Sequence, residues 1–119
     1  MPIDHAPTPP AIICEAPRAI DGDTIRCANI PVAVRMIGID APELPGHCRK
    51  GRSCTPGDGY AAQRALAAML AAGPVHVHPS PHNDRYGRLL ARLVVAGADL
   101  NCALITAGQA VARYSVLVC

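Results

Sequence analysis

The chain has to build its core without large aromatic side chains. Phe and Trp are absent, and the only aromatic residues are Tyr60, Tyr86 and Tyr114, although 50% of the 119 residues are hydrophobic. The core must therefore come from Ala, Val, Leu and Ile, within one domain of ordinary size. With 12 Pro, 10 Gly and 17% charged residues, the composition is typical of a turn-rich globular domain. No stretch approaches the roughly 20 apolar residues of a membrane-spanning helix, so we expect no membrane partner.

Proline and glycine residues divide the chain into short segments. Within residues 12–30 the turn signal Asp21-Gly22-Asp23 predicts a β-hairpin, with an edge position or bulge at Pro17. Good helix formers fill Tyr60–Ala72, and Asp58 is placed to cap this predicted helix. The remaining expected elements are strands at 32–39, 75–78 and 89–95 and a short helix at 100–107, which Asp99 caps.

Five short strands, with a helix between the third and the fourth, are the order of an OB-type barrel. We therefore predict an α+β, mainly β fold for residues 12–119: a five-stranded OB-type barrel with two helices. Residues 1–11 are proline-rich and are expected to form a disordered leader. Residues 41–59 are expected to form a long loop and 79–87 a turn; loops as long as the first are usually functional or tied down. No helix or strand is predicted for the tail at 110–119.

Three polar segments stand out. They are the turn Asp21–Thr24, the strand and its exit Arg35–Glu43, and the turn Asp84–Arg88. Each segment alone is more often structural than functional, because Asp and Gly are common turn residues and a charged turn is commonly just solvated. Their combination is more specific than any one of them.

Together the three segments fit phosphodiester hydrolysis. This reaction needs a cation to polarise the phosphoryl group, a base to take a proton from water, and positive groups to stabilise the charge that develops on the phosphate. Asp23, Asp40 and a main-chain carbonyl supply the hard oxygen ligands that suit Ca²⁺. Glu43 is the candidate base, and Arg35 and Arg88 are the candidate phosphate clamps.

The three segments, in this order and spacing, resemble the successive motifs of the staphylococcal nuclease (thermonuclease) family. The residues that follow, in Leu100–Gly108, resemble the next helix of that family, so the similarity runs from about Ala19 to Tyr114. The resemblance implies a five-stranded OB-type barrel. It also implies calcium-dependent cleavage of DNA and RNA, with single-stranded or denatured nucleic acid as the partner and 3′-phosphate ends as the product.

The resemblance also implies a calcium site. Asp23 and Asp40 match the carboxylate ligands of the family, and the Ala41 carbonyl matches a third ligand to which the side chain does not contribute. Asp21 would support these ligands without touching the metal. Glu43 matches the family residue that acts as general base or positions the attacking water, and both roles stay open.

The substrate-binding residues follow in the same way. Arg35 and Arg88 match the two phosphate-binding arginines of the family. Arg85, Tyr86 and Tyr114 match positions that contact the terminal phosphate of the substrate, the first as Arg instead of Lys.

Two departures from the family pattern affect the expectations. The chain ends soon after Tyr114, so the third, C-terminal helix of the family is expected to be missing. The oligomeric state stays open, with association through that side as one alternative. The net charge is only +2, with 11 Lys or Arg against 9 Asp or Glu, so we expect weaker and more salt-limited nucleic-acid binding than for a Lys-rich nuclease.

Six cysteines are many for a domain of this size, and an even number favours disulfides and an oxidising compartment. We expect a periplasmic or secreted protein; reduced thiols in a cytosol are the alternative, because Met1–Ala11 shows no signal peptide. The six residues are Cys14, Cys27, Cys48, Cys54, Cys102 and Cys119.

Two pairs suggest themselves. Cys48 and Cys54 lie in one loop and can close it, while Cys14 and Cys27 can staple the first hairpin if a bulge near Pro17 absorbs their unequal distance from the turn. The other two cysteines are left over, and nothing else pairs them. A competing hypothesis is a zinc site at His47 with Cys48 and Cys54, although a fourth ligand is not obvious.

Two other classes of function compete with the enzyme. A non-catalytic nuclease-like module that binds nucleic acid or protein would keep the barrel but lose the acids, whereas this chain keeps all five charged positions of the motifs. A disulfide-rich structural or inhibitory domain would depend on its disulfides and not on calcium. A nuclease assay with and without calcium separates the three.

Overall fold

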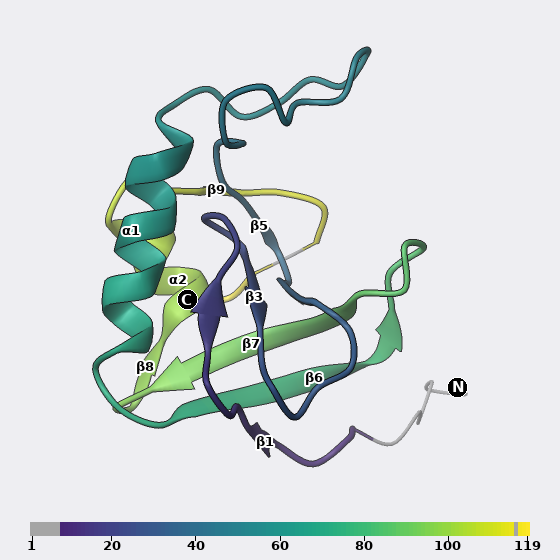
Figure 1. Ribbon diagram of the computed structural model, residues 1–119, viewed down its shortest axis with the longest axis vertical. Coiled ribbons are helices and arrows are strands. Elements are labelled where there is room, and N and C mark those ends of the chain that lie inside the picture. Colours follow the sequence, from purple (N-terminus) through teal and green to yellow (C-terminus); the bar gives the residue numbers. More distant parts are fainter. Residues whose placement is uncertain (1–7, 116) are drawn as a thin grey trace.

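The computed structural model describes residues 8–115 and 117–119 (Figure 1). The predicted disordered leader at 1–11 falls mostly on residues 1–7, outside the described residues. The elements in chain order are β1 (Ile12–Ile13), β2 (Arg18–Ala19), β3 (Thr24–Arg26), β4 (Val34–Met36), β5 (Ile39–Asp40), α1 (Gly59–Leu70), β6 (Val75–Asn83), β7 (Leu89–Val95), β8 (Ala98–Asp99), α2 (Leu100–Thr106) and β9 (Val111–Ala112).

The main sheet is curled and mostly antiparallel. Its strands follow the order β1-β6-β7-β4-β3-β2, and β8 pairs with β7. The pair β4 and β7 is parallel, which places Arg35 beside Leu90, two residues after Arg88. A second, two-stranded sheet joins β5 to β9. This half-barrel with two helices confirms the predicted OB-type, α+β fold.

Several strand boundaries differ from the predicted ones. The predicted strand 32–39 is split into β4 and β5 by a turn at Gly38, whose φ of +80° favours glycine. Ile12–Ile13 pairs with β6 and leaves β2 and β3 as the hairpin. The predicted turn at 79–87 is wrong in its first half, because β6 continues to Asn83 across an irregularity in the β6–β7 register.

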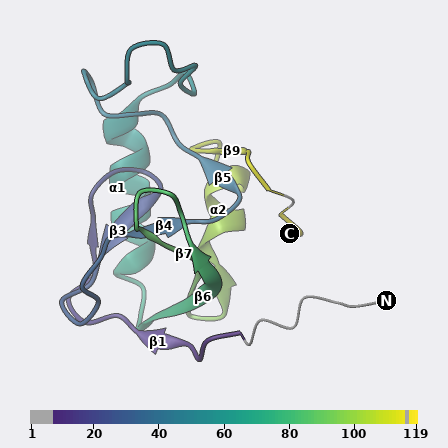
Figure 2. The same cartoon turned by 90° about the vertical axis from the view of Figure 1, so that its right-hand side faces the viewer.

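Both helices begin where their caps predict. The Asp58 carboxylate accepts a hydrogen bond from the Ala61 N–H, and the Asp99 carboxylate accepts one from the Cys102 N–H. Figures 1 and 2 show that the loop between β5 and α1 extends beyond the N-terminal end of α1. Among the described residues after α2 there is no third helix; the chain forms β9 there instead.

The core is aliphatic, as the composition requires. All three tyrosines are at least half exposed, and Tyr114 reaches 67%. The largest fully buried apolar side chains are Ile25, Met36, Ile39, Leu66, Leu93, Leu104, Val34, Val75, Val77 and Val95.

All six cysteines form disulfides: Cys14–Cys27, Cys48–Cys54 and Cys102–Cys119. The two pairs expected from the sequence are confirmed, and the zinc hypothesis is wrong because the Cys48–Cys54 disulfide uses both thiols. Three disulfides indicate an oxidising, non-cytoplasmic compartment. No helix in the described part of the chain is long and apolar enough to cross a bilayer.

Candidate active site

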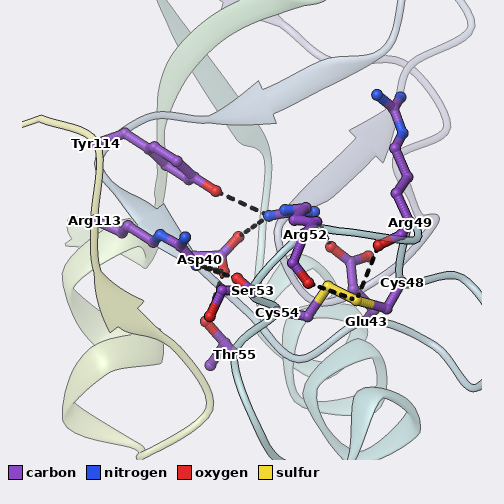
Figure 3. Close-up of a disulfide and its surroundings, with 10 residues drawn as sticks. All are labelled: Asp40, Glu43, Cys48, Arg49, Arg52, Ser53, Cys54, Thr55, Arg113 and Tyr114. Atoms are coloured by element: carbon purple, nitrogen blue, oxygen red, sulfur yellow. Dashed lines mark hydrogen bonds and ion pairs between the residues drawn. A yellow bond between two sulfur atoms is a disulfide. The ribbon is translucent and has the colours of Figure 1, made fainter.

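The carboxylate of Asp40, at the end of β5, is fully buried and surrounded by donors. Its Oδ1 lies 3.3 Å from Arg35 and 3.0 Å from Arg52. Its Oδ2 accepts hydrogen bonds from the Thr55 hydroxyl at 2.6 Å and from Arg113 at 3.2 Å. Figure 3 shows Asp40 between Arg52, Arg113 and Thr55. Three guanidinium groups and one hydroxyl therefore compensate the burial of this charge.

The turn between β2 and β3 brings Asp23 to the same place. A Cβ at Gly22 would lie 2.6 Å from the Ala62 Cβ and 2.7 Å from the Ala41 Cβ, so glycine lets the turn pack closely against α1 and the end of β5. Asp23 Oδ2 accepts a hydrogen bond from the Ala41 N–H at 2.8 Å and lies 3.3 Å from Arg35. Asp21 holds the turn by accepting the Asp23 N–H.

Arg35, on β4, joins the two acids. One of its nitrogens, Nη2, lies 3.3 Å from both Asp23 Oδ2 and Asp40 Oδ1. The guanidinium also donates to the carbonyl oxygens of Met36 and Ile39, and the residue is only 7% exposed. Arg35 is therefore fixed in the floor of the site and holds the two carboxylates together.

Burial makes the charged form of the Asp23 carboxylate less favourable. Burial raises its pKa to about 7; Arg35 lowers the pKa, Asp21 raises it further and the Ala41 N–H lowers it. An additional cation nearby would stabilise the charged form of such a buried carboxylate.

The donor set fits a calcium ion in its chemistry. Two carboxylates with oxygens near one Arg35 nitrogen, followed directly by the Ala41 carbonyl, provide hard oxygen ligands. Within residues 8–115 and 117–119, no group of three or more His, Cys, Asp or Glu residues is arranged to hold a metal. Any cation here would therefore depend on these two acids together with main-chain or water oxygens.

Glu43 lies at the start of the long loop, beside Arg52. A Cβ at Gly59 would collide with the Glu43 carbonyl group, so the first turn of α1 packs directly on this part of the loop. Arg52 Nη1 lies 2.5 Å from Glu43 Oε1, and Arg52 Nη2 donates to the Tyr114 hydroxyl at 2.9 Å (Figure 3). The hydrogen bond to Tyr114 raises the pKa of Arg52 above its ordinary value, and Asp40 raises it further.

The turn between β6 and β7 forms a second cluster. Arg88 Nε lies 2.7 Å from Asp84 Oδ2, and Asp84 Oδ1 also accepts the N–H groups of Tyr86 and Arg88. The Tyr86 hydroxyl accepts hydrogen bonds from Arg85 and Arg49. Those two bonds lower the pKa of Tyr86, that from Arg85 most. The guanidinium carbons of Arg49, Arg85 and Arg88 lie 4.6, 4.9 and 5.5 Å from the ring centre.

A groove of about 370 Å³ runs along this second cluster. It has three arginines and a tyrosine in its walls and no acidic residue. We call it the basic groove, and its lining residues are Arg26, Pro31, Val32, Ala33, Arg49, Tyr86, Gly87 and Arg88.

The structure thus brings the predicted site residues together as two clusters. Asp23, Arg35, Asp40, Ala41 and Asp21 are joined by direct contacts, and Arg52 adds Glu43 and Tyr114 to them. Within the described part of the chain, no hydrogen bond or ion pair links this acidic cluster to the second one, of Arg85, Tyr86 and Arg88. The Cys48–Cys54 loop spans both, because Arg49 contacts Tyr86 and Arg52 contacts Asp40.

Sequence reasoning missed four residues of the site. Two of them, Arg49 and Arg52, lie between Cys48 and Cys54 in a loop that follows Glu43. This position was the available signal, since a closed loop next to a candidate acid restricts where its arginines can reach. The four residues are Arg49, Arg52, Thr55 and Arg113.

The chain belongs to the family of staphylococcal nuclease homologues, because its residues 33–117 match the model of that family. The chain is similar to the SPbeta prophage-derived endonuclease YokF of Bacillus subtilis (strain 168), with 32% identity over 102 residues, which cover 82% of this chain and 33% of YokF. It is also similar to the endonuclease YncB of the same organism, with 32% identity over 101 residues, which cover 82% of this chain and 46% of YncB. The chain spans less than half the length of either relative.

Proposed function

We propose that this protein is an exported, calcium-dependent nuclease that hydrolyses phosphodiester bonds of single-stranded or denatured DNA and of RNA. The convergence of Asp23 and Asp40 on Arg35, next to Glu43, carries this proposal, because it joins two of the three polar segments in one buried cluster of acids. Membership in the family and the similarity to two endonucleases support it. The three disulfides support export.

The acidic cluster would hold the metal and the attacking water. Asp23, Asp40 and the Ala41 carbonyl are the proposed calcium ligands. When bound, calcium supplies positive charge that polarises the phosphate and acidifies water. Glu43, half-buried at the edge of the same cluster, is the proposed group that orients the water and accepts its proton.

The arginines would bind the substrate phosphate. Arg88 lines the basic groove and keeps its terminal nitrogens for a phosphate while Asp84 holds its Nε. Arg35 is bound mainly to the acids, so its contribution to phosphate binding would act from the floor of the site. Arg85, Tyr86 and Tyr114 are the proposed contacts of the terminal phosphate.

The decisive experiment follows cleavage of denatured DNA and of RNA by the purified chain, with calcium and with a chelator. We expect cleavage only with calcium, 3′-phosphate ends, and a rate about 10²–10⁴-fold lower for Glu43→Gln. Glu15→Gln, a matched change at an exposed site, should keep the full rate. Folded protein that binds but never cuts either nucleic acid with calcium would instead favour the non-catalytic module.

A further inference from the structure

The Arg52 guanidinium contacts two carboxylates that the proposed chemistry assigns to calcium binding and to the base. It contacts Asp40 at 3.0 Å and Glu43 at 2.5 Å, so it joins a proposed calcium ligand to the proposed base. These two carboxylates, with the Tyr114 hydroxyl, are the only side-chain partners of Arg52 in the described structure. The guanidinium therefore already neutralises the acids on which the reaction depends.

Asp40 has no spare side-chain acceptor for a further cation. Each of its two oxygens is within hydrogen-bond or ion-pair distance of two donors. Arg35 is nearly buried and tied to two main-chain carbonyls, and Arg113 also donates to the Ser53 carbonyl. Within residues 8–115 and 117–119 the Arg52 guanidinium has no main-chain acceptor, and its side chain is 32% exposed. Of the three guanidinium groups, Arg52 is the one that contacts both Asp40 and Glu43, so it is the group that an ion held beside these two acids would replace.

The loop that carries Arg52 limits how far it can move. The Cys48–Cys54 disulfide closes the loop, and inside it the Arg52 N–H donates to the Arg49 carbonyl at 3.0 Å. Closing so short a segment removes most of its alternative conformations. A displaced Arg52 side chain would thus remain at the mouth of the acidic cluster.

From these contacts we propose that Arg52 is a built-in counter-cation that exchanges with the metal ion. It is a positioning residue: it orders Asp40 and Glu43 in the metal-free protein and gives way when the ion binds. This inference rests on the proposed calcium site. Its consequence is that Arg52 weakens metal binding, because its ion pairs must be broken first.

Calorimetric titration of the metal-free full chain with Ca²⁺ tests the exchange without nuclease activity. Arg52→Gln removes the competing charge, so we expect its Kd for calcium to fall about twofold to fivefold, in keeping with the modest strength of partly exposed ion pairs. Arg52→Lys keeps a charge without the forked geometry and should lie in between. Lys50→Gln is the matched control, with the same charge lost from the same loop, and should bind calcium as the wild type does.

A second measurement separates exchange from simple loosening. Without metal, Arg52→Gln should melt at a lower temperature than the wild type, since Asp40 and Glu43 lose their partner, and saturating calcium should close that gap. An unchanged or weaker calcium affinity in Arg52→Gln would overturn the exchange and leave the calcium proposal standing. Absence of calcium binding in both proteins would overturn the two together.

Discussion

At the scale of single residues, the site depends on balancing the charges of two buried carboxylates. Asp40 is fully buried and Asp23 nearly so, and neither could keep its charge there alone. Arg35 neutralises both from below, while Arg52 and Arg113 approach Asp40 from the loop and the tail. The acids are therefore held ready by arginines from three separate segments, and removing one partner leaves the others with unpaired charge.

In the second cluster, at the turn between β6 and β7, Asp84 allows a test by pH. Partial burial alone would raise the pKa of Asp84, but the N–H and guanidinium of Arg88 and the N–H of Tyr86 outweigh it, and the pKa is lowered. A folded-state pKa below the unfolded value means that Asp84 stabilises the fold above about pH 4 and loses this effect as the pH falls through the folded pKa.

We therefore expect Asp84→Asn to melt at a lower temperature than the wild type at neutral pH, with the gap closing as the pH falls through the lowered folded-state pKa of Asp84. Melting curves followed by circular dichroism from neutral to acidic pH measure the gap. Glu15→Gln, at an exposed position, should show no comparable gap. A gap for Asp84→Asn that widens on acidification would contradict the assigned contacts.

The arginines also mark the limit of prediction at this scale. Asp23, Asp40 and Glu43 were predictable because each follows a turn or strand signal within a recognisable motif. Arg113 was not, because its contact with Asp40 spans 73 residues along the chain and no local pattern encodes such a distance. Arg52 lies 12 residues from Asp40, and only its position in the closed Cys48–Cys54 loop pointed to the site.

At the scale of elements, close packing of the β2–β3 turn on α1 sets the position of Asp23. The turn itself was predictable from its Asp-Gly-Asp signal, and α1 and α2 from their caps. The pairing of β1 with β6 was not, since Ile12 lies 65 residues before its partner Val77 and a two-residue strand has no periodicity of its own. The continuation of β6 through Pro79 was missed for a local reason: proline signals a turn, and here it lies next to an irregularity in the register.

Gly22→Ala tests this packing. The added methyl would meet two short side chains, Ala62 and Ala41, that cannot move aside, so we expect the free energy of unfolding to fall by about 2 kcal/mol. Urea unfolding measures the change. Gly73→Ala is the control, because its new Cβ would have only an ordinary 3.8 Å contact with Val95. Equal effects at the two positions would contradict the close approach of turn and helix.

At the scale of the whole molecule, the proposed function requires a nearly balanced charge to serve a polyanionic substrate. The net charge of +2 gives little long-range attraction, so binding depends on where the cations lie. The basic groove gathers Arg26, Arg49 and Arg88 with no acid in its walls, which makes it the expected path of the proposed nucleic-acid strand. Tyr86, half exposed there, offers a ring on which a base can stack.

The salt dependence of binding measures how many cations take part. With about three phosphates contacted in the groove, log K for single-stranded DNA should fall with log salt with a slope of about −2, and Arg49→Ala should reduce its magnitude by about 0.7. Fluorescence polarisation in the presence of a chelator measures binding without cleavage. Arg64→Ala, an equal loss of charge on α1 outside the groove, should leave the slope unchanged. The groove assignment fails if the two variants behave alike.

The absence of Phe and Trp has a consequence for experiment. Near-ultraviolet emission of this protein comes from tyrosine alone, and two of its three tyrosines, Tyr86 and Tyr114, accept hydrogen bonds from arginines of the Cys48–Cys54 loop. The third, Tyr60, lies at the start of α1. The molecule thus carries native optical probes in both clusters of the candidate site, and their signal can test the proposed ion and substrate binding without a label.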